Sequence, residues 1–250
     1  LSTRVGDTSC ETLLSSDGRR LALSDVGSIW CRSFVPTGFP ADFNAADRKF
    51  AEVEAARALD SLLSLPGIVW INHPHRYVLA NSKPAQLKMA REVGLSIPET
   101  LVTNEPEAVR AFIAEAPGPV VYKCFSQWLD LPEGQAQYTG VVTAAQVGQL
   151  DLIRATPGVF QHYVEKAFEL RVTVVGDRIF AGRINSQANE TSKIDWRHRP
   201  FDMDPVPYAL PEAIGASIRA FMAGFGLVYG AFDFIVRPDG RYVFLEVNPG

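Results

Sequence analysis

The sequence has few cysteines, and their spacing suits neither a disulfide framework nor a zinc site. Its three cysteines, Cys10, Cys31 and Cys124, are widely spaced and form no C-x-x-C pair. The four histidines include His73-Pro74-His75, but the sequence contains no H-E-x-x-H motif. An odd number of scattered thiols is typical of reduced cytoplasmic proteins. We therefore expect a cytoplasmic location and no zinc.

Long apolar runs and a strong excess of one charge are also missing. No apolar stretch approaches the roughly 20 residues that span a bilayer, and the start, LSTRVGDTSCE, lacks the character of a signal peptide. The net charge of −4 provides no general attraction for nucleic acid. We expect no membrane or nucleic-acid partner. The 250 residues, of which 47% are hydrophobic, suit one large globular domain or two small ones.

The first third of the chain shows alternating strand and helix patterns. Asp17-Gly18 lies between two apolar segments, which predicts a hairpin. Residues 26–34 and 68–72 resemble buried strands, and residues 44–65 between them form the clearest helix, with Asn44 as its cap. This alternation predicts an α/β unit with a parallel sheet.

The last 22 residues, YGAFDFIVRPDGRYVFLEVNPG, predict two strands joined by a turn at Pro238-Asp239. Pairing outward from this turn places Asp233 opposite Phe244 and Ala231 opposite Glu246. Asp233 and Glu246 are then diagonal neighbours on one face, roughly 7–8 Å apart, and Asn248 shares that face. Two carboxylates and an amide oxygen suit Mg²⁺. The alternative is an ordinary hairpin whose acids face water.

Two lysines are candidates for binding phosphate. Lys83 lies at the start of a helix predicted from Ser82 to Val93, where free N–H groups favour an anion. Lys123 lies within the strand VVYKCF among apolar neighbours, which is an unusual place for a solvated charge. A solvated side chain is the alternative for each.

Residues 160–187 predict further strands, with a turn at Gly176-Asp177. Several charges interrupt this apolar ribbon. Glu169 and Arg171, two residues apart, share a face, and Arg183 follows on the next strand. Surface ion pairs would explain them equally well. The segment from Lys193 to Arg199 is a polar, basic loop around Trp196.

The order of these features resembles the ATP-grasp superfamily of carboxylate–amine ligases, and within it the graspetide (microviridin-type) maturases of ribosomal peptides. The resemblance covers most of the chain from Ser28 onward. It is carried by SIWCR (28–32), INHP (71–74), ANSKPAQLKMAREVGLSIPETLVTNEPEAV (80–109), VEKAFELRVTVVGDRIFAGRINSQ (164–187), IDWR (194–197) and GAFDFIVRPDGRYVFLEVNPG (230–250).

The resemblance implies an α/β (α+β) ATP-grasp fold with three parts. Residues 1–80 would form a pre-ATP-grasp domain, and residues 81–163 and 164–250 the two lobes that clamp ATP. Family members carry a strand and a helix before the first segment and a Trp-containing tail after N-P-G, neither of which is in this sequence. The family's W-Y-R-R-P reads Trp30-Cys31-Arg32-Ser33-Phe34 here, which leaves the role of that element open.

The resemblance also assigns roles to individual residues. Lys83 and Lys123 would hold the phosphates of ATP, and the stretch Gln161 to Val164 would present backbone groups to adenine. Either Glu165 or Glu169 would contact the ribose. The remaining residues divide into three groups: Mg²⁺ ligands (Asp233, Glu246, Asn248), side chains that neutralise the acyl phosphate (Arg171, Arg183) and contacts to the peptide substrate (Asp195, Arg197).

The implied reaction is ATP-dependent macrocyclisation of a precursor peptide with a leader and a core. An Asp or Glu side chain would become an acyl phosphate, which a Ser or Thr hydroxyl or a Lys amine would attack. A homodimer is a further expectation from the resemblance. Two alternatives stay open: a ligase that adds amino acids to a protein or peptide terminus, and a degenerate ATP-grasp module that only binds a peptide.

Overall fold

The structure is a computed structural model that describes residues 2–5, 10–16, 18–30, 39–40, 42–60, 67–125, 139–188, 192–196 and 205–250. The chain divides into two compact units, Leu1–Val78 together with Gly250, and Leu79–Pro249. None of the helices in the described parts of the chain is long and apolar enough to cross a membrane.

The first unit contains a small antiparallel sheet and a parallel strand pair. Strands β1 (Ser2–Val5), β2 (Cys10–Ser16) and β3 (Arg19–Ala22) form the sheet in that order, followed by the short helix η1 (Leu23–Asp25). Ser16 pairs with Arg19, which confirms the hairpin predicted at Asp17-Gly18.

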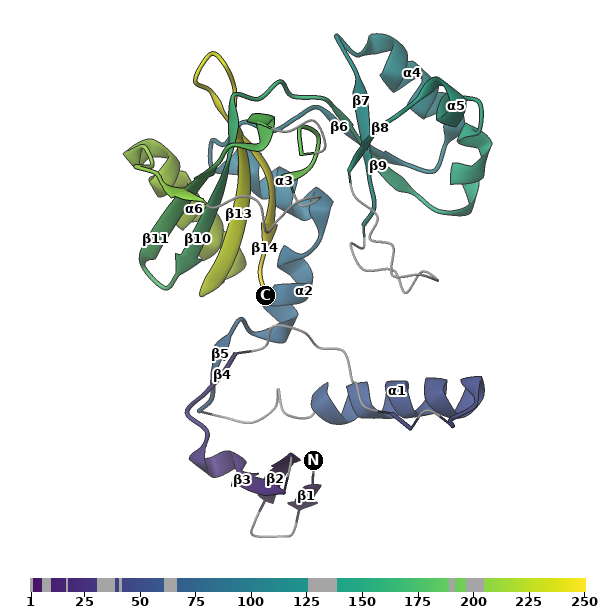
Figure 1. The fold of residues 1–250 in the computed structure, drawn as a ribbon. Helices are drawn as coiled ribbons and strands as arrows, with labels where there is room; N and C mark the ends of the chain where they lie inside the picture. The colour runs from purple at the N-terminus through teal and green to yellow at the C-terminus, as the bar shows by residue number, and fades with distance from the viewer. Residues whose placement is uncertain are drawn as a thin grey trace. The chain divides into compact units, whose positions relative to one another are not determined.

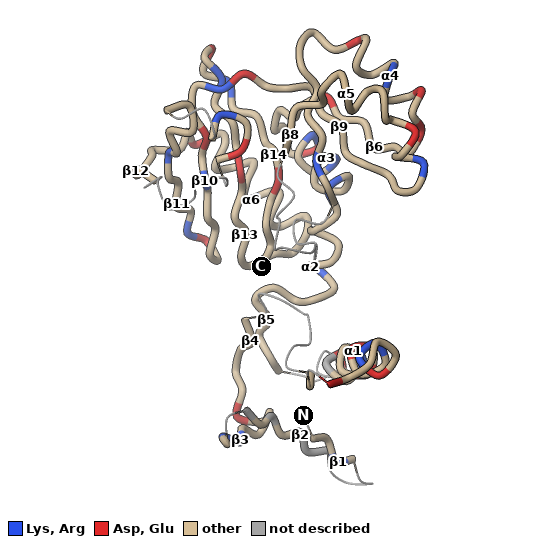
Figure 2. The backbone as a smooth tube through the Cα atoms, turned by 45° about the vertical axis from the view of Figure 1, so that its right-hand side comes forward, with Lys and Arg blue, Asp and Glu red and all other residues tan. Residues whose placement is uncertain are grey.

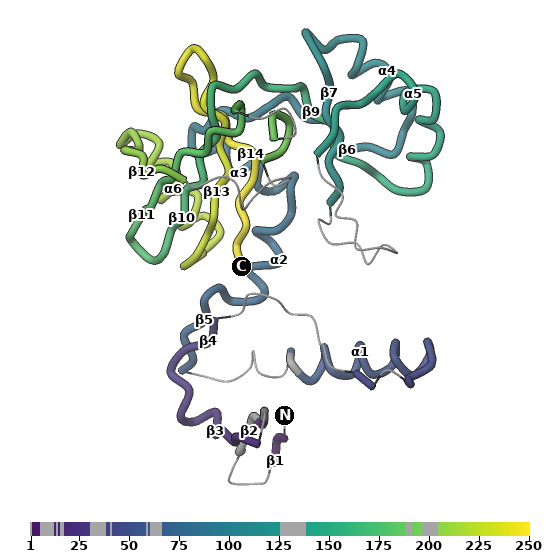
Figure 3. The backbone as a smooth tube through the Cα atoms, in the orientation of Figure 1, coloured from purple at the N-terminus to yellow at the C-terminus, as the bar shows by residue number. Residues whose placement is uncertain are grey.

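A helical crossover joins the two parallel strands of this unit (Figure 3). Strand β4 (Ser28–Trp30) pairs in parallel with β5 (Val69–Ile71), and α1 (Ala45–Asp60) lies between them in sequence. The side chain of Asn44 accepts the N–H groups of Ala46 and Asp47, both at 2.9 Å, so Asn44 caps α1 as predicted. A parallel α/β pair is therefore confirmed. The sequence analysis did not anticipate α2 (Pro74–Ala80).

One part of the second unit is a four-stranded antiparallel sheet. Its order is β6 (Thr100–Thr103), β9 (Gly158–His162), β7 (Val120–Lys123) and β8 (Gly140–Val141). Three helices accompany it, α4 (Pro106–Glu115), α5 (Ala144–Val147) and η3 (Leu150–Ala155) (Figure 1). Buried Val109 and Phe112 of α4 pack with Val120, Leu150 and Phe160 to form its core.

A five-stranded antiparallel sheet dominates the rest of the second unit. Its order is β12 (Val206–Pro207), β11 (Arg178–Ile184), β10 (Phe168–Val175), β13 (Tyr229–Val236) and β14 (Tyr242–Asn248). The short helix η4 (Ser186–Ala188) follows β11. Helices α3 (Lys83–Glu92) and α6 (Glu212–Phe225) pack against this sheet, and their buried side chains join those of β10, β13 and β14 in one core. The core residues include Leu87, Leu170, Val172, Ile218, Phe221, Phe232, Phe234 and Phe244.

The hairpin of β13 and β14 forms as predicted, but the predicted register is wrong. Gly240, with φ of 82°, closes a loop in which the Arg237 N–H donates to the Arg241 carbonyl. Such a loop has three residues rather than two, so Val236 pairs with Tyr242. A β-bulge then adds one more residue beyond Phe234. The two shifts place Asp233 directly opposite Glu246.

Candidate active site

A cavity in the second unit collects side chains from both of its sheets. Lys123 and Gln161 come from the four-stranded sheet, and Glu169, Asp233 and Glu246 come from the five-stranded one. Figure 2 marks the charged positions along β10, β13, β14 and α3. Five residues that the sequence analysis selected from distant segments therefore line one space.

Two buried carboxylates stand at the base of this cavity. Asp233 is 5% exposed and Glu246 is 7% exposed, and the bulge makes them direct cross-strand partners. Asn248 pairs with Ala231 one step further along the same two strands, and alternation places it on the face that carries Glu246. Because buried charges are costly unless they are paired, this acidic face requires cations.

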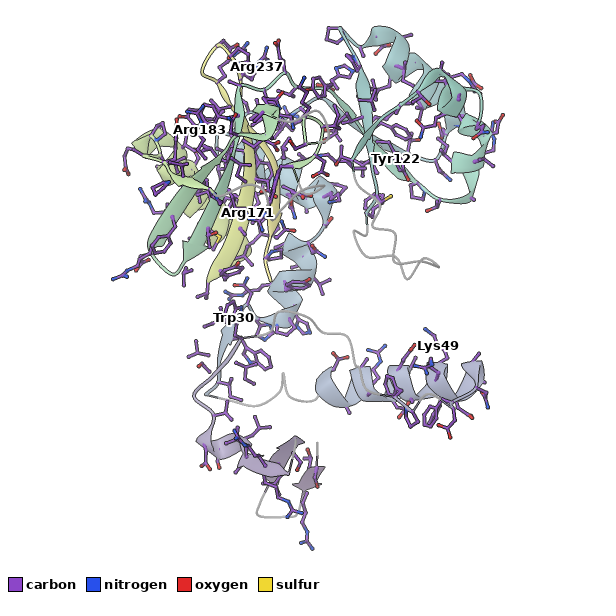
Figure 4. The ribbon with its side chains drawn as sticks, in the orientation of Figure 1. Trp30, Lys49, Tyr122, Arg171, Arg183 and Arg237 are labelled. Atoms are coloured by element: carbon purple, nitrogen blue, oxygen red, sulfur yellow. The ribbon has the colours of Figure 1, made fainter. Side chains whose placement is uncertain are left out.

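Each of the two carboxylates has a cation beside it. The Lys83 ammonium, at the first residue of α3, lies 2.9 Å from Glu246 Oε2. The Arg171 Nη1 on β10 lies 2.9 Å and 2.8 Å from the two carboxylate oxygens of Asp233. Figure 4 labels Arg171 on the sheet. Lys83 and Arg171 are therefore linked to the cavity because each contacts a carboxylate that lines it.

The oxygen donors of this face fit Mg²⁺. Mg²⁺ is commonly held by one or two carboxylates and completes its coordination with substrate phosphates and water. Asp233, Glu246 and Asn248 offer two carboxylates and an amide oxygen. Among the described residues there is no group of three or more His, Cys, Asp or Glu that could hold a metal ion.

The stretch expected to present backbone groups to adenine lines the same cavity. Gln161 and Val164 both contribute to it, and the Gln161 amide, in a side chain that is 3% exposed, donates to Thr100 Oγ1 at 2.9 Å. The backbone N–H groups of His162 and Tyr163 already donate to the carbonyls of Glu99 and Pro119. Val164 is thus the better placed member of this stretch for a backbone contact.

Of the two glutamates considered for ribose, the structure brings only Glu169 to the cavity. Glu169 is 4% exposed and lines the cavity, whereas Glu165 is exposed and lies outside it. The Lys166 ammonium, also buried, lies 2.8 Å from Glu169 Oε1. Burial, and secondly the carboxylates of Glu169 and Glu165, raise the pKa of the Tyr163 hydroxyl. Tyr163 therefore stays protonated at neutral pH.

The residues expected near the peptide divide in the same way. Asp195 is 4% exposed, lines the cavity, and accepts the Thr139 N–H at 3.2 Å. The neighbouring Ile194 carbonyl accepts a hydrogen bond from Lys166 at 3.0 Å. Asp195 is thus part of the cavity wall, and its contact with a peptide stays a prediction. Arg197 lies outside the described residues.

Arg183 is another predicted charge that the structure places away from Asp233 and Glu246. It pairs across the strands with Leu170, a core residue, and directly opposed residues share a face of the sheet. Its guanidinium stacks 4.2 Å from the centre of the Phe168 ring, and Figure 4 labels it apart from Arg171. Arg183 therefore occupies the helix-covered face, opposite the face of Asp233.

Sequence reasoning missed two buried polar residues of the site, Lys166 and Gln86. Lys166 lies in the charged ribbon but carried no signal that distinguished it from a surface ion pair. Gln86 is 3% exposed and hydrogen-bonds to β14 from α3. A glutamine within a helix has no distinctive pattern, so only the fold could identify it.

A cavity between two sheets, lined by Lys123, Gln161 and a buried acid pair that Lys83 and Arg171 contact, is typical of an ATP-grasp nucleotide site. Comparison with solved structures supports this class. An ATP-grasp ligase from Chryseobacterium gregarium, associated with ribosomally synthesised and post-translationally modified peptides (RiPPs) and solved with ADP and a leader and core peptide, matches with a TM-score of 0.88. It is 31% identical, and the match covers 99% of this chain and 76% of the ligase.

Two macrocyclases from Microcystis aeruginosa MRC match as well, each at 32% identity over 99% of this chain. MdnC, bound to the precursor peptide MdnA, gives a TM-score of 0.86 over 78% of its length, and MdnB gives 0.81 over 77%. No family model and no curated protein matched the sequence. The chain belongs to the family of RiPP-associated ATP-grasp ligases, which confirms the resemblance and the ATP-grasp fold.

Proposed function

We propose that this ligase uses ATP to close rings in a ribosomal precursor peptide. The γ-phosphoryl group passes to an Asp or Glu side chain of the peptide, and ADP leaves. A Ser or Thr hydroxyl or a Lys amine of the same peptide then attacks the acyl carbon, and inorganic phosphate leaves. Each ω-ester or ω-amide bond therefore removes one water from the peptide.

The observation that carries this proposal is the paired arrangement of charges at Asp233 and Glu246. Phosphoryl transfer depends mainly on positioning and on neutralising phosphate charge, and the site contains groups of both signs. Lys83 and Lys123 are assigned to the phosphates. Mg²⁺, when bound at Asp233, Glu246 and Asn248, supplies further positive charge to the phosphates.

The ion pairs at the two carboxylates support roles for both cations. Lys83 and Arg171 each hold one carboxylate. With Asp233 and Glu246 holding a metal, Lys83 and Arg171 would be free to neutralise phosphate and the acyl phosphate. We assign Arg171 this second role, and we leave Arg183 out of the mechanism because it lies on the other face of the sheet.

The remaining site residues bind the nucleotide and define the lobes. We assign adenine to the stretch from Gln161 to Val164 and the ribose to Glu169. We propose that residues 81–163 and 164–250 act as the two lobes that clamp ATP, with residues 1–80 as the preceding domain.

The peptide partner is the second half of the proposal. The similar ligases from C. gregarium and M. aeruginosa were solved with a leader and core peptide and with a precursor peptide. We propose that the segment from Lys193 to Arg199, of which residues 193–196 are described, attracts an acidic core by complementary charge. Peptide affinity that does not fall as salt is added would contradict this attraction.

A homodimer and a cytoplasmic location complete the proposal, and neither affects the chemistry. Sedimentation velocity over a range of protein concentrations tests the first. A single species with the mass of one chain at all concentrations would exclude it.

The test of the function is incubation with ATP, Mg²⁺ and candidate precursor peptides, followed by mass spectrometry. We expect the peptide to lose one water for each crosslink, with one ADP formed per crosslink. The controls omit ATP or use Asp233→Asn. A peptide that gains the mass of an amino acid would instead support a terminus-extending ligase, and a peptide that binds but stays unchanged would support a binding module.

A further inference from the structure

The strand that carries Glu246 and Asn248 lies at the edge of its sheet. Within its sheet β14 pairs only with β13, and an edge strand leaves a row of backbone N–H and C=O groups that need other partners. At Val243 and Phe244 that partner is Ser96, which forms an isolated parallel bridge with Val243 and whose carbonyl accepts the Phe244 N–H at 2.8 Å. The two metal ligands flank Val247, which is 1% exposed and opposite Phe232. Whatever bonds to the outward groups of Val247 therefore helps fix both ligands.

The partner of Val247 is the side chain of Gln86. The Gln86 amide donates to the Val247 carbonyl at 2.9 Å, and its oxygen accepts the Val247 N–H at 2.9 Å. One side-chain amide thus occupies the place that a neighbouring strand would take. The second Gln86 N–H donates to the carbonyl of Ala80, the last residue of α2, at 2.7 Å. Both donor hydrogens are used, which fixes the orientation of the amide.

The same residue is close to the phosphate side of the site. Gln86 lies three residues after Lys83 on α3, and residues with this spacing share one face of a helix. Helix α3 runs beside β14 (Figure 1), and the Lys83 ammonium reaches Glu246, the residue before Val247. The Gln86 amide and the Lys83–Glu246 ion pair are thus two adjacent links between one helix and one strand.

We propose that Gln86 is a positioning residue that sets β14 against α3, and thereby sets Glu246 and Asn248 against Lys83. This inference rests on the proposed function, which assigns metal to the first two residues and phosphate to the third. An apolar side chain could fill the same space, but it would not resist sliding of the strand along its axis. Two opposed hydrogen bonds to one residue do resist it, and a slip of one residue moves a strand by about 3.4 Å.

The test compares Gln86→Met with Gln86→Glu and with the control Gln149→Met. Methionine keeps the length of glutamine without its donors and acceptor. Glutamate keeps the acceptor for the Val247 N–H but loses both donors. Gln149, which precedes η3, is exposed and makes no side-chain cap of that helix, so its replacement is a control for exchanging glutamine for methionine in itself.

Two measurements separate positioning from general stability. The first is amide hydrogen exchange at Val247 without metal or nucleotide, where we expect acceleration by about tenfold or more in Gln86→Met, less in Gln86→Glu and none in Gln149→Met. The second is the Mg²⁺ concentration that half-saturates ATP turnover, measured well below the melting temperature of each variant. We expect it to rise roughly 10- to 100-fold in Gln86→Met.

The results distinguish failure of this inference from failure of the proposed function. If the wild-type protein crosslinks peptide while folded Gln86→Met keeps the wild-type Mg²⁺ requirement, the positioning role is wrong and the function stands. If the wild-type protein binds no ATP with Mg²⁺, the function itself fails. Loss of folding in both Gln86 variants would show a purely structural role and overturn the inference.

Discussion

The two faces of the five-stranded sheet are built from the same strands but have opposite chemistry. On one face, Phe232, Phe234 and Phe244 pack with Leu170 and Val172 under the helices, and none of them is more than 1% exposed. On the other face, Asp233 and Glu246 are equally hidden from bulk water but carry charge. Adjacent residues of β13 thus serve the core and the site alternately.

The difference between the two faces shows how the sheet can bury charged side chains and still be stable. The apolar face stabilises the unit through the area it buries, and it holds β13 rigidly in place. The charged face depends on that rigidity, because a buried carboxylate destabilises the fold strongly when its cation moves away. The bulge beyond Phe234 then aligns Asp233 with Glu246 without disturbing the pairing of Phe234 with Phe244.

The largest expected effect comes from breaking the charged face. Asp233→Asn should lower the rate of ATP-dependent crosslinking by roughly 10²- to 10³-fold, because the proposed metal site loses a carboxylate and its charge. Melting should change little, since the Arg171 side chain is 31% exposed and can turn to water. Crosslinking is measured by mass spectrometry and folding by circular dichroism.

The control for this prediction is Asp177→Asn, which changes an exposed acid in the turn between β10 and β11. It should retain wild-type activity. Full activity in Asp233→Asn would remove Asp233 from the metal site.

The next effect comes from breaking the apolar face. Phe234→Ala should lower the free energy of unfolding by about 3–5 kcal/mol, because it leaves a cavity among aromatic rings. Urea denaturation measures the loss. Phe180→Ala provides the comparison, because Phe180 is 55% exposed and its replacement should change stability by only about 0.5 kcal/mol. Equal losses in the two variants would contradict this division.

A matched pair of arginines compares the faces directly. Arg171→Ala should reduce turnover by roughly a hundredfold, because Arg171 lies on the charged face. Arg183→Ala should reduce it by less than about threefold, because Arg183 lies on the helix-covered face. Single-turnover kinetics with one peptide measure both variants. A larger loss in Arg183→Ala would return Arg183 to the mechanism and reverse the assignment made here.

The smallest expected effect is a pH dependence of folding stability that comes from Tyr242, at the margin of the helix-covered face. Burial, followed by the hydrogen bond with Tyr208, raises the pKa of Tyr242 to about 12, and the two hydroxyl oxygens lie 2.6 Å apart. Because the folded pKa is above the unfolded value of about 10, the folded state keeps the proton more tightly. Its contribution to stability is fully present below pH 10 and is lost as the pH rises toward 12.

Denaturation curves at intervals between pH 8 and pH 11.5 test this expectation. Tyr242→Phe should show a weaker decline of the unfolding free energy over that interval than the wild-type protein. Identical slopes would mean that Tyr242 titrates normally.

The sequence allowed most of the fold and much of the site to be predicted, for local reasons. Strand alternation and the Pro-Asp-Gly turn predicted the last hairpin, and Asn44 predicted the start of α1. The identity of the acids followed from their position inside an apolar pattern. The register did not follow, because a three-residue loop and a bulge differ from a tight turn by single residues with no separate sequence signal.

The contacts between segments distant in the sequence could not be predicted from local patterns. Lys83 meets Glu246 across 163 positions of the sequence, and no local pattern states that α3 packs beside β14. Arg183 illustrates the opposite error, since a charge in the right order along the chain was assigned to the site. Its cross-strand partner, Leu170, belongs to the core, and that pairing is decided only when the strands associate.

The sequence by itself determined which residue types were available: two lysines, an acid pair with an amide, and the strands that present them. Alternation along a strand and spacing along a helix are local properties, so they can be read from neighbouring residues. Tertiary structure alone decided which charges share a face, that Asp233 stands opposite Glu246, and that Gln86 joins β14 to α3. These choices depend on how separate segments pack, because the free energy of burying charge is settled by partners that are distant in the chain.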